Sequence, residues 1–525
     1  MPLSLNQLLS NQAMRRSDEP VIVDVARTWS YEDAAHAAGR VGRALVMSGV
    51  AAGDRVGVHL NKSADGFIAM HAVVSIGAIA VPLDPSSPAT RLSRICQSME
   101  IDVVVSHKPR SKSLAAMHAI RPLRVVIGCD APVEALAAIG VDELATLDPL
   151  APANVDEDDA SYIITTSGST GEPKGMVHTH RSALAYANMT VRTYDLTADD
   201  RVSDIAPHHF DISTHSLWSV PLAGATNIVV NEAYQRLPAS HSQLLQDQAV
   251  TYWYSVPFLL HQLVLRGDLE NRDLSALRWV HFGGEVISPR VIGEMMKHAP
   301  NARFGNIFGP AETNQCSLAI FDTAPDPDAP LSVGFPLDHS DIRVIDPDAS
   351  DPSPENAMGV GEMGEMWAHT PQLMEGYWNK PEVNARVLKE LDGKRFYRTG
   401  DLISIDENGE LSFFGRVDHQ VKVRGFRIEL EGIELELEQL DGADHVVVGV
   451  LRAQSGEDEL VAGLLGTSSD FDEVEFLRSA ASVLPAYAVP TRTVQIDAAA
   501  FTGSGKLDRR VLREHTVSTL KEPAS

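Results

Sequence analysis

Hydrophobic residues along the first 310 positions follow two alternating patterns. Short runs rich in β-branched and aromatic residues predict buried strands. These runs are VGVHL (56–60), VVVS (103–106), VVIG (125–128), YIITTS (162–167), RVSDIA (201–206), TNIVV (226–230), TYWYSV (251–256) and RWVHF (278–282). Amphipathic segments between them predict helices over 181–193 and 288–298. This alternation predicts layered α/β sheets with helices on their faces.

One apolar stretch, residues 67–83, carries no formal charge and resembles a membrane span. It is interrupted by His71, Gly77 and Pro82, and a span needs about 20 consecutive apolar residues. We therefore expect a buried helix that runs into a short strand, and no membrane association.

The second half of the chain has a different pattern. The Asp- and Pro-rich segment 323–358 predicts a looped connection, and GEMGEMWAHT and ELSFFGR predict strands of a smaller β-rich region. After Asp418, VKVRGFRI, HVVVGVL, ELVAGLL and TRTVQI read as strands, with helices over 430–440 and 472–483. The order β-α-β-β-α-β predicts a compact α+β domain. We expect a large α/β body over 1–417 and a small mobile α+β lid over 418–525, with a hinge at Asp418.

Charge and cysteine content narrow the function classes. Lys and Arg total 44 against 71 Asp and Glu, which gives a net charge of −27 and disfavours nucleic acid and anionic membranes as partners. Cys96, Cys129 and Cys316 are widely spaced, which excludes a disulfide scaffold and familiar zinc spacings. With no secretion signal at the N-terminus, we expect a cytoplasmic protein.

The sharpest local motif is TSGSTGEPKG, residues 166–175, directly after a predicted strand. Glycines let backbone N–H groups approach an anion, hydroxyls add donors, and a lysine adds charge. The motif therefore predicts a triphosphate cradle, although it matches neither a Walker A loop nor the dinucleotide fingerprint. A flexible surface loop would not explain the ordered TGEPKG ending. The cradle residues are Thr166, Ser167, Gly168, Ser169, Thr170, Gly171 and Lys174.

Further motifs lie before and after this loop, in a fixed order along the chain. They are GAIAVPLDP (77–85), FDIS (210–213), FGGE (282–285), NIFGPAETN (306–314), FYRTGDL (396–402), GRVDHQVKVRGFRIE (415–429) and GSGKLDRR (503–510). Over essentially its whole length the chain resembles the acyl-adenylate-forming superfamily, which includes acyl-CoA synthetases, luciferases and nonribosomal peptide synthetase adenylation domains. The sequences of these motifs most resemble those of adenylation domains that activate amino acids. The resemblance implies ATP and Mg²⁺ as cofactors.

The resemblance also implies a set of nucleotide contacts. Asp401 would accept both ribose hydroxyls, which suits the two oxygens of a carboxylate, and Arg416 would make a second ribose or phosphate contact. Phe308 would stack on adenine and Asn306 would meet the base edge. The family more often has Tyr at position 308, but Phe keeps the stacking face.

Three residues match the catalytic positions of the family. Glu312 would bind Mg²⁺, a hard cation shared with substrate phosphates, and Thr313 would contact the α-phosphate. Lys506 would bridge the carboxylate and the α-phosphate as charge develops. A lone lysine near a C-terminus is normally only solvated, but GSGKLDRR in register favours the catalytic interpretation.

The class of substrate depends on Asp211, which resembles the aspartate that holds the substrate ammonium in amino-acid-activating relatives. A pocket carboxylate needs a cationic counterpart; the alternative is an N-cap of the following helix. Phe282 is expected to shorten the pocket, which favours a small α-, β- or proline-like amino acid. The remaining pocket residues by motif alignment are Ile212, His215, Tyr254, Val280, Gly283, Ile307, Gln315 and Cys316.

Two pairs of histidines and two clusters of charged residues also require an interpretation. The pairs at 178/180 and 208/209 lack a carboxylate or cysteine at useful spacing for a metal, although the second pair adjoins FDIS and can serve the pocket. The acidic run 429–438 is interpreted as the solvated face of a helix. Arg509, Arg510 and Arg513 are interpreted in the same way, or as a docking site for an acidic partner.

The acceptor of the activated acyl group is expected to be another molecule. Only 19 residues follow Lys506, and no carrier domain is visible. We expect transfer to the phosphopantetheine thiol of a separate carrier protein in natural-product biosynthesis, such as that of antibiotics, with CoA as the alternative acceptor. Acyl-CoA ligation of a non-amino acid is the runner-up function, against which Asp211 argues. A scaffold without activity would predict loss of Lys506, Glu312 or Asp401.

Overall fold

The computed structural model describes residues 4–133, 136–166, 172–349, 356–417, 420–443, 445–453, 457–467, 471–496 and 509–521. The chain forms two compact units. The first unit comprises Met1–Pro85, Met99–Thr165 and Gly175–Val417. The second comprises Ser86–Ser98, Thr166–Lys174 and Asp418–Ser525. None of the helices in the described ranges is long and apolar enough to cross a membrane.

The first sheet of unit 1 has the order β16-β15-β14-β13-β12-β10-β11-β1-β2. Its strands are β1 (Pro20–Val23), β2 (Thr28–Ser30), β10 (Arg201–Asp204), β11 (Thr226–Val229), β12 (Tyr252–Ser255), β13 (Trp279–Gly283), β14 (Arg303–Phe308), β15 (Ser317–Phe321) and β16 (Phe335–Pro336). The central strands from β1 to β14 are parallel, and β2, β15 and β16 are antiparallel to their neighbours. Parallel strands end at the same edge, so this topology collects the loops after β10, β13 and β14 on one side.

The second sheet has the order β19-β9-β8-β4-β3-β5-β6-β7. Its strands are β3 (Arg55–His59), β4 (Ile79–Pro82), β5 (Val103–Ser106), β6 (Val125–Ile127), β7 (Ala137–Ile139), β8 (Ala160–Thr166), β9 (Lys174–Thr179) and β19 (Gly376–Tyr377). The third sheet contains β17 (Asp341–Ile345), β18 (Gly364–His369), β20 (Leu388–Leu391), β21 (Lys394–Ile405) and β22 (Leu411–Arg416). All pairs in the third sheet are antiparallel. The strands β16 and β17 lie within segment 323–358, so the expectation of a purely looped connection there is wrong.

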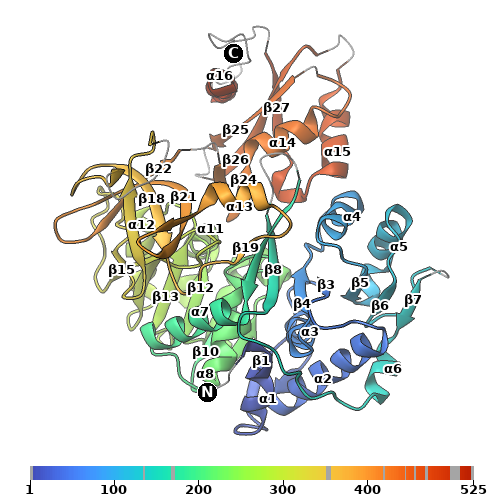
Figure 1. The fold of residues 1–525 in the computed structure, drawn as a ribbon. Coiled ribbons are helices and arrows are strands. Elements are labelled where there is room, and N and C mark those ends of the chain that lie inside the picture. The colour runs from blue at the N-terminus through green and yellow to red at the C-terminus, as the bar shows by residue number, and fades with distance from the viewer. Residues whose placement is uncertain are drawn as a thin grey trace. The chain divides into compact units, whose positions relative to one another are not determined.

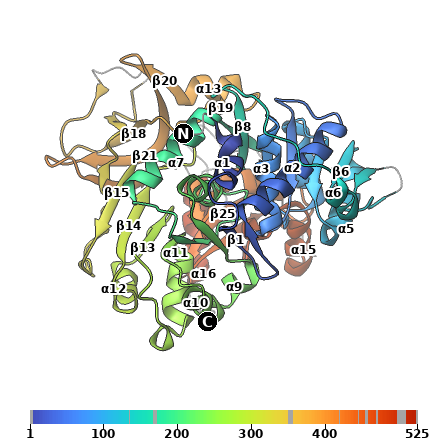
Figure 2. The same ribbon diagram turned by 90° about the horizontal axis from the view of Figure 1, so that it is seen from below.

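Helices pack against the first and second sheets. Those of unit 1 are α1 (Leu8–Ala13), α2 (Tyr31–Met47), α3 (Ala64–Ser75), α5 (Ser111–Ile120), α6 (Val141–Thr146), α7 (His180–Thr193), α8 (Val220–Ala223), α9 (Glu232–Arg236), α10 (Pro238–Asp247), α11 (Pro257–Arg266), α12 (Pro289–His298) and α13 (Pro381–Val387). Figure 1 shows α2, α3, α5 and α6 in blue and cyan around β3 to β7. In Figure 2, α10, α11 and α12 group along one side of the first sheet. The stretch 67–83 forms the buried end of α3 and the buried strand β4, which confirms the predicted helix and strand.

Side-chain alternation on β12 and β13 separates two cores. Trp253, Val280 and Phe282 pack with side chains of α11 and α12 on one face of the first sheet. Tyr254 and Trp279 belong to the cluster on the opposite face, together with side chains of α7. Helix α7 begins at a reciprocal cap, in which Thr179 and Ser182 bond to each other's backbone N–H at 3.1 and 3.0 Å. The second face carries Tyr254 and Ile307, two residues predicted for the side-chain pocket.

Unit 2 contains a small α+β fold. Its elements after residue 418 are β23 (Gln420–Val423), β24 (Phe426–Glu429), α14 (Leu430–Leu437), β25 (His445–Arg452), β26 (Asp458–Leu465), α15 (Glu473–Val483), β27 (Arg492–Gln495) and α16 (Arg509–Lys521); α4 (Ala89–Ser98) also belongs to this unit. Strand β26 pairs antiparallel with β25 and parallel with β27. The fold class, an α/β body with a small α+β region, is confirmed.

Two expectations for this unit are wrong. VKVRGFRI is a hairpin rather than one strand, because Arg424 and Gly425 adopt φ of 53° and 86°; positive φ at both central residues defines a tight type I′ turn. Glu434 and Arg513 are not solvated, because Glu434 is fully buried and accepts from Arg513 Nε at 2.9 Å. The hinge at Asp418 stays a prediction, because that residue lies outside the described ranges.

Candidate active site

The predicted ribose contacts lie opposite each other on neighbouring strands. Asp401 on β21 is in register with Arg416 on β22, and Arg416 Nη1 donates to Asp401 Oδ1 at 2.6 Å. Such a charge-assisted bond fixes the carboxylate. The structure therefore brings the two residues together as an ion pair, and their contact with ribose stays a prediction.

The predicted adenine contacts occupy the end of β14 beside this pair. Asn306 donates from Nδ2 to the Ser332 carbonyl at 2.9 Å. The Phe308 ring lies 5.5 Å from that of Phe413 on β22. Residues 306 and 308 share a face of their strand, so an aromatic ring and an amide lie together at the C-terminal end of β14.

Cys316 lies with these nucleotide residues. Its side chain is buried in the cluster that Phe308 joins. Burial raises the pKa of the Cys316 thiol to about 12, and the nearby Asp401 carboxylate adds to the rise. Its Sγ lies 3.1 Å from Thr313 Oγ1 in a hydrogen bond. Cys316 is therefore a neutral thiol that helps hold Thr313, the predicted α-phosphate contact.

Glu312, the predicted magnesium ligand, is fully buried in the loop between β14 and β15. Tyr377 donates its hydroxyl to Glu312 Oε1 at 2.5 Å. Burial lowers the pKa of His178 to about 4, an effect that the nearby Glu312 charge opposes. One hard carboxylate fits Mg²⁺, which usually takes only one or two protein carboxylates and completes its shell with phosphates and water.

The glycine-rich motif joins β8 to β9. Thr166 ends β8 and Lys174 begins β9, so the ends of the predicted cradle are on adjacent strands of the second sheet. Residues 167–171, which carry Ser167, Gly168, Ser169, Thr170 and Gly171, lie outside the described ranges, as does Lys506. Their roles stay predictions.

Asp211 lies in the turn before the short π-helical segment His215–Ser219. Its backbone carbonyl accepts from the Thr214 N–H at 3.0 Å and the Thr214 hydroxyl at 2.6 Å. Its carboxylate charge raises the pKa of Tyr162, Tyr186 and Tyr254, for which burial is the larger cause. Asp211 thus lies near buried, neutral phenols that come from β8, α7 and β12, and we call this packed group of side chains the chamber.

The chamber also contains other predicted pocket residues. His215 stacks on Tyr252 with ring centroids 4.9 Å apart and meets Tyr254 edge-on at 5.7 Å. Burial lowers the pKa of His215 to about 3, so the imidazole is neutral. Tyr194 donates its hydroxyl to Gln315 Oε1 at 2.6 Å. Ile212 and Ile307 pack with the same cluster.

Val280 and Phe282 do not join this chamber. Both are fully buried in the core on the opposite face of the first sheet. His281, which the motif alignment missed, lies on the chamber side, with its ring 4.2 Å from Tyr194 and its Nδ1 bonded to the Tyr252 hydroxyl. Gly283 shares the face of His281, and a Cβ on Gly283 would lie 2.4 Å from the Ile307 carbonyl oxygen. The alternation of side chains along a strand indicates this placement, because residues 280 and 282 lie on one face of the strand and residues 281 and 283 lie on the other.

The histidine pairs are part of the packed interior. His178, His180 and His208 are buried, and burial lowers the pKa of each imidazole. His209 Nε2 lies 3.8 Å from Asp84 Oδ1. Among the described residues, no cluster of three or more His, Cys, Asp or Glu side chains is arranged to hold a metal.

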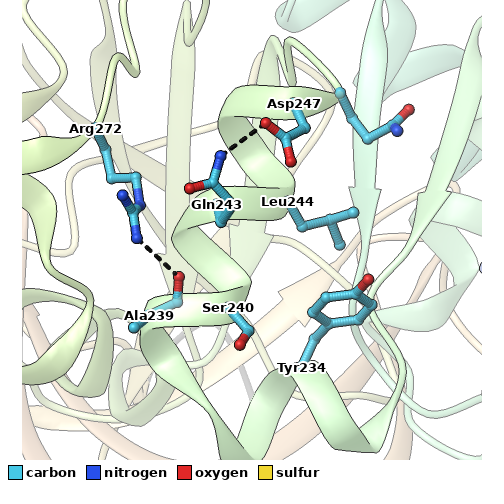
Figure 3. Close-up of a pocket in the computed structure, with 8 residues that line it drawn as sticks. Tyr234, Ala239, Ser240, Gln243, Leu244, Asp247 and Arg272 are labelled. Carbon is cyan, nitrogen blue, oxygen red and sulfur yellow. Dashed lines mark hydrogen bonds between the residues drawn. The ribbon is translucent and has the colours of Figure 1, made fainter.

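A groove of about 460 Å³ lies along α10 (Figure 3). It is lined by Tyr234, Ala239, Ser240, Gln243, Leu244, Asp247, Gln248 and Arg272. Gln243 donates to Asp247 at 2.7 Å and Arg272 donates to the Ala239 carbonyl at 3.5 Å. None of the predicted site residues lines this groove.

Known proteins resemble this chain along nearly its whole length. A family model described as AMP-binding enzyme matches residues 9–378. The chain is 32% identical over 519 residues to phenyloxazoline synthase MbtB of Mycolicibacterium paratuberculosis; the match covers 98% of this chain and 42% of that protein. The chain thus spans less than half of that relative.

Two further relatives match over nearly their whole length. An L-proline–[L-prolyl-carrier protein] ligase of Pseudomonas fluorescens is 29% identical over 515 residues, covering 97% of this chain and 98% of that protein. The solved adenylation domain AlmE of Vibrio cholerae, in complex with glycyl-adenosine-5′-phosphate, superposes with a TM-score of 0.84. It covers 99% of this chain and 98% of its own at 22% identity, which establishes a shared fold.

Proposed function

Because this chain belongs to the family of AMP-binding enzymes, we propose that it activates a small amino acid with ATP and passes it to a carrier thiol. In the first step an amino-acid carboxylate oxygen bonds to the α-phosphorus of ATP, and the bond from that phosphorus to the bridging oxygen of pyrophosphate breaks. The products are aminoacyl-AMP and pyrophosphate. In the second step a thiolate attacks the acyl carbon and AMP leaves.

The observation that carries the amino-acid assignment is the setting of Asp211. Its carboxylate acts electrostatically on three buried phenols, Tyr162, Tyr186 and Tyr254. A substrate ammonium would pair with the Asp211 carboxylate, and a charge-assisted hydrogen bond is among the stronger polar contacts. The bulk of Tyr254, Ile307 and His215 around it supports a small side chain.

Each of the remaining site residues would contact a different part of the nucleotide. Phe308 and Asn306 would hold the base, the Asp401–Arg416 pair the ribose, and Thr313 the α-phosphate. Glu312 would hold Mg²⁺, which neutralises phosphate charge when bound. Lys506 would stabilise the charge that develops during adenylation.

A separate carrier protein is the acceptor that the relatives support best. The Pseudomonas fluorescens relative, which matches along nearly its whole length, is named as a carrier-protein ligase. A thiol on a long phosphopantetheine arm reaches an acyl-adenylate without a covalent link between the two proteins. CoA ligation of an acid without an amine is the competing outcome.

Pyrophosphate exchange across a panel of amino acids and their deaminated counterparts tests the proposal. Asp211→Asn keeps the side-chain shape and removes the charge, and Asp199→Asn, at an exposed position before β10, is the matched control. Loss of a charge-assisted bond of about 1.5–3 kcal/mol lowers exchange by about 10- to 150-fold. Preference for an acid without an amine, with Asp211→Asn fully active, would establish the CoA-ligase alternative instead.

A further inference from the structure

The three sheets of unit 1 meet at a cluster of two phenols and a carboxylate. Glu312 comes from the loop after β14 in the first sheet, Tyr377 from β19 in the second, and Tyr397 from β21 in the third. The Tyr377 hydroxyl lies 2.5 Å from Glu312 Oε1 and 3.3 Å from the Tyr397 hydroxyl. All three side chains are buried. We infer that Tyr377 is the positioning residue that holds Glu312 in its metal-binding orientation, an inference that rests on the proposed function.

Tyr377 is itself fixed by backbone hydrogen bonds. Asn384 at α13 accepts from the Tyr377 N–H at 2.7 Å and donates to the Tyr377 carbonyl at 3.0 Å. Strand β19 pairs with β9, with Tyr377 opposite Met176. The Glu312 carbonyl accepts from the Met374 N–H at 2.8 Å. Both ends of the phenol–carboxylate bond are therefore attached to rigid backbone.

Strand β19 also connects this carboxylate to the strand that leaves the phosphate loop. The Trp378 N–H donates to the Gly175 carbonyl at 2.8 Å, and the Glu375 N–H donates to the Val177 carbonyl at 2.8 Å. Lys174, the last residue of the predicted cradle, begins β9. Residues 374–378 thus link the backbone of Glu312 to that of β9.

The physical effect of the Tyr377 hydroxyl is on orientation. A short O–H···O⁻ bond to Oε1 restricts the rotation of the buried carboxylate. Hydrogen bonds to a ligating carboxylate orient it toward the metal, and their loss typically weakens metal affinity by about 10- to 100-fold. Tyr377 touches neither substrate nor metal in this account, and acts only through Glu312.

Metal binding by the whole 525-residue chain tests this inference directly. Mn²⁺, which replaces Mg²⁺, is titrated by electron paramagnetic resonance in the presence of a non-hydrolysable ATP analogue. For Tyr377→Phe, which removes only the hydroxyl, we expect the dissociation constant of Mn²⁺ to rise about 10- to 100-fold. The control is Tyr31→Phe, which removes another buried hydroxyl that donates to the Ala225 carbonyl at 2.8 Å; its Mn²⁺ affinity stays within about twofold of wild type.

A second variant tests the positioning role of Tyr377 if Tyr377→Phe does not fold. Asn384→Ala removes the two bonds that bracket Tyr377 but keeps the phenol, and we expect a smaller loss of Mn²⁺ affinity. Wild-type Mn²⁺ affinity in folded Tyr377→Phe, or in Asn384→Ala if Tyr377→Phe is unfolded, overturns the positioning role. If the wild-type protein binds no Mn²⁺ with the analogue, the proposed function itself fails, which is a different result.

Discussion

The ion pair between Glu434 and Arg513 gives a quantitative prediction for the stability of unit 2. Glu434 on α14 is fully buried and its Oε1 accepts from Arg513 Nε at 2.9 Å and from the Val448 N–H at 2.8 Å. Arg513→Met keeps an apolar side chain of similar length on α16 but leaves a carboxylate buried without this cation. Removing one partner of a buried pair costs about 3–5 kcal/mol. Lys506 precedes α16 closely in sequence, so we expect adenylation to fall as well.

A double variant separates the charge from the packing. Adding Glu434→Gln to Arg513→Met removes the buried charge and leaves an amide oxygen for the Val448 N–H, so we expect most of the stability to return. Replacing a buried pair by neutral groups is often close to neutral in stability. The double variant is therefore the control for loss of arginine packing.

Hydrogen exchange of β25 amides measures this stability in the full chain. A loss of about 3–5 kcal/mol speeds exchange of the slowest β25 amides by about two to four orders of magnitude. Amides of the first sheet in unit 1 serve as the internal reference. A change below about 1 kcal/mol in Arg513→Met, or no recovery in the double variant, would refute the assignment of a buried, stabilising pair.

Three further predictions follow from the placement of single residues. Phe282→Ala leaves a cavity in the core behind β13 and lowers stability by about 3–5 kcal/mol in urea denaturation, without widening the amino-acid range in the exchange panel; a wider range with unchanged stability would return Phe282 to the pocket. Lys506→Ala lowers pyrophosphate exchange about 100- to 1000-fold while nucleotide binding, measured by calorimetry, is retained; half the wild-type rate would remove Lys506 from the mechanism. Asp418→Pro restricts the backbone of the predicted hinge and slows thioester formation, followed by mass spectrometry of the carrier, more than adenylation; equal loss of both rates contradicts the hinge.

Much of the fold was predictable because buried parallel strands leave continuous apolar runs in the sequence. The runs at 103–106 and 125–128 became β5 and β6 nearly to the residue. The hairpin at Arg424 was missed because a non-glycine residue with positive φ gives a weak turn signal before a single glycine. The burial of Glu434 was missed because its partner, Arg513, lies 79 positions away in the sequence.

The residues of the candidate site also fall into those that the sequence indicates and those that only the structure reveals. Local motifs single out Glu312, Thr313 and Asp401 as candidates, because each stands in a short run of residues with its own recognisable pattern, and their roles stay predictions. The side-chain pocket is built across strands, where a shift of one residue moves a side chain to the other face. That is why His281, rather than Phe282, lies on the chamber side. The role of Tyr377 needed the structure, because β19 reaches Glu312 from a different sheet.

Product analysis with ATP, Mg²⁺ and a small amino acid tests the central claim most directly. Hydroxylamine traps the activated acyl group as a hydroxamate, and AMP and pyrophosphate are quantified in the same reaction. The account predicts one AMP and one pyrophosphate for each hydroxamate, with activity that requires the amino group and falls sharply in Asp211→Asn. Formation of ADP and phosphate, or equal turnover of the corresponding acid without an amine, would contradict it.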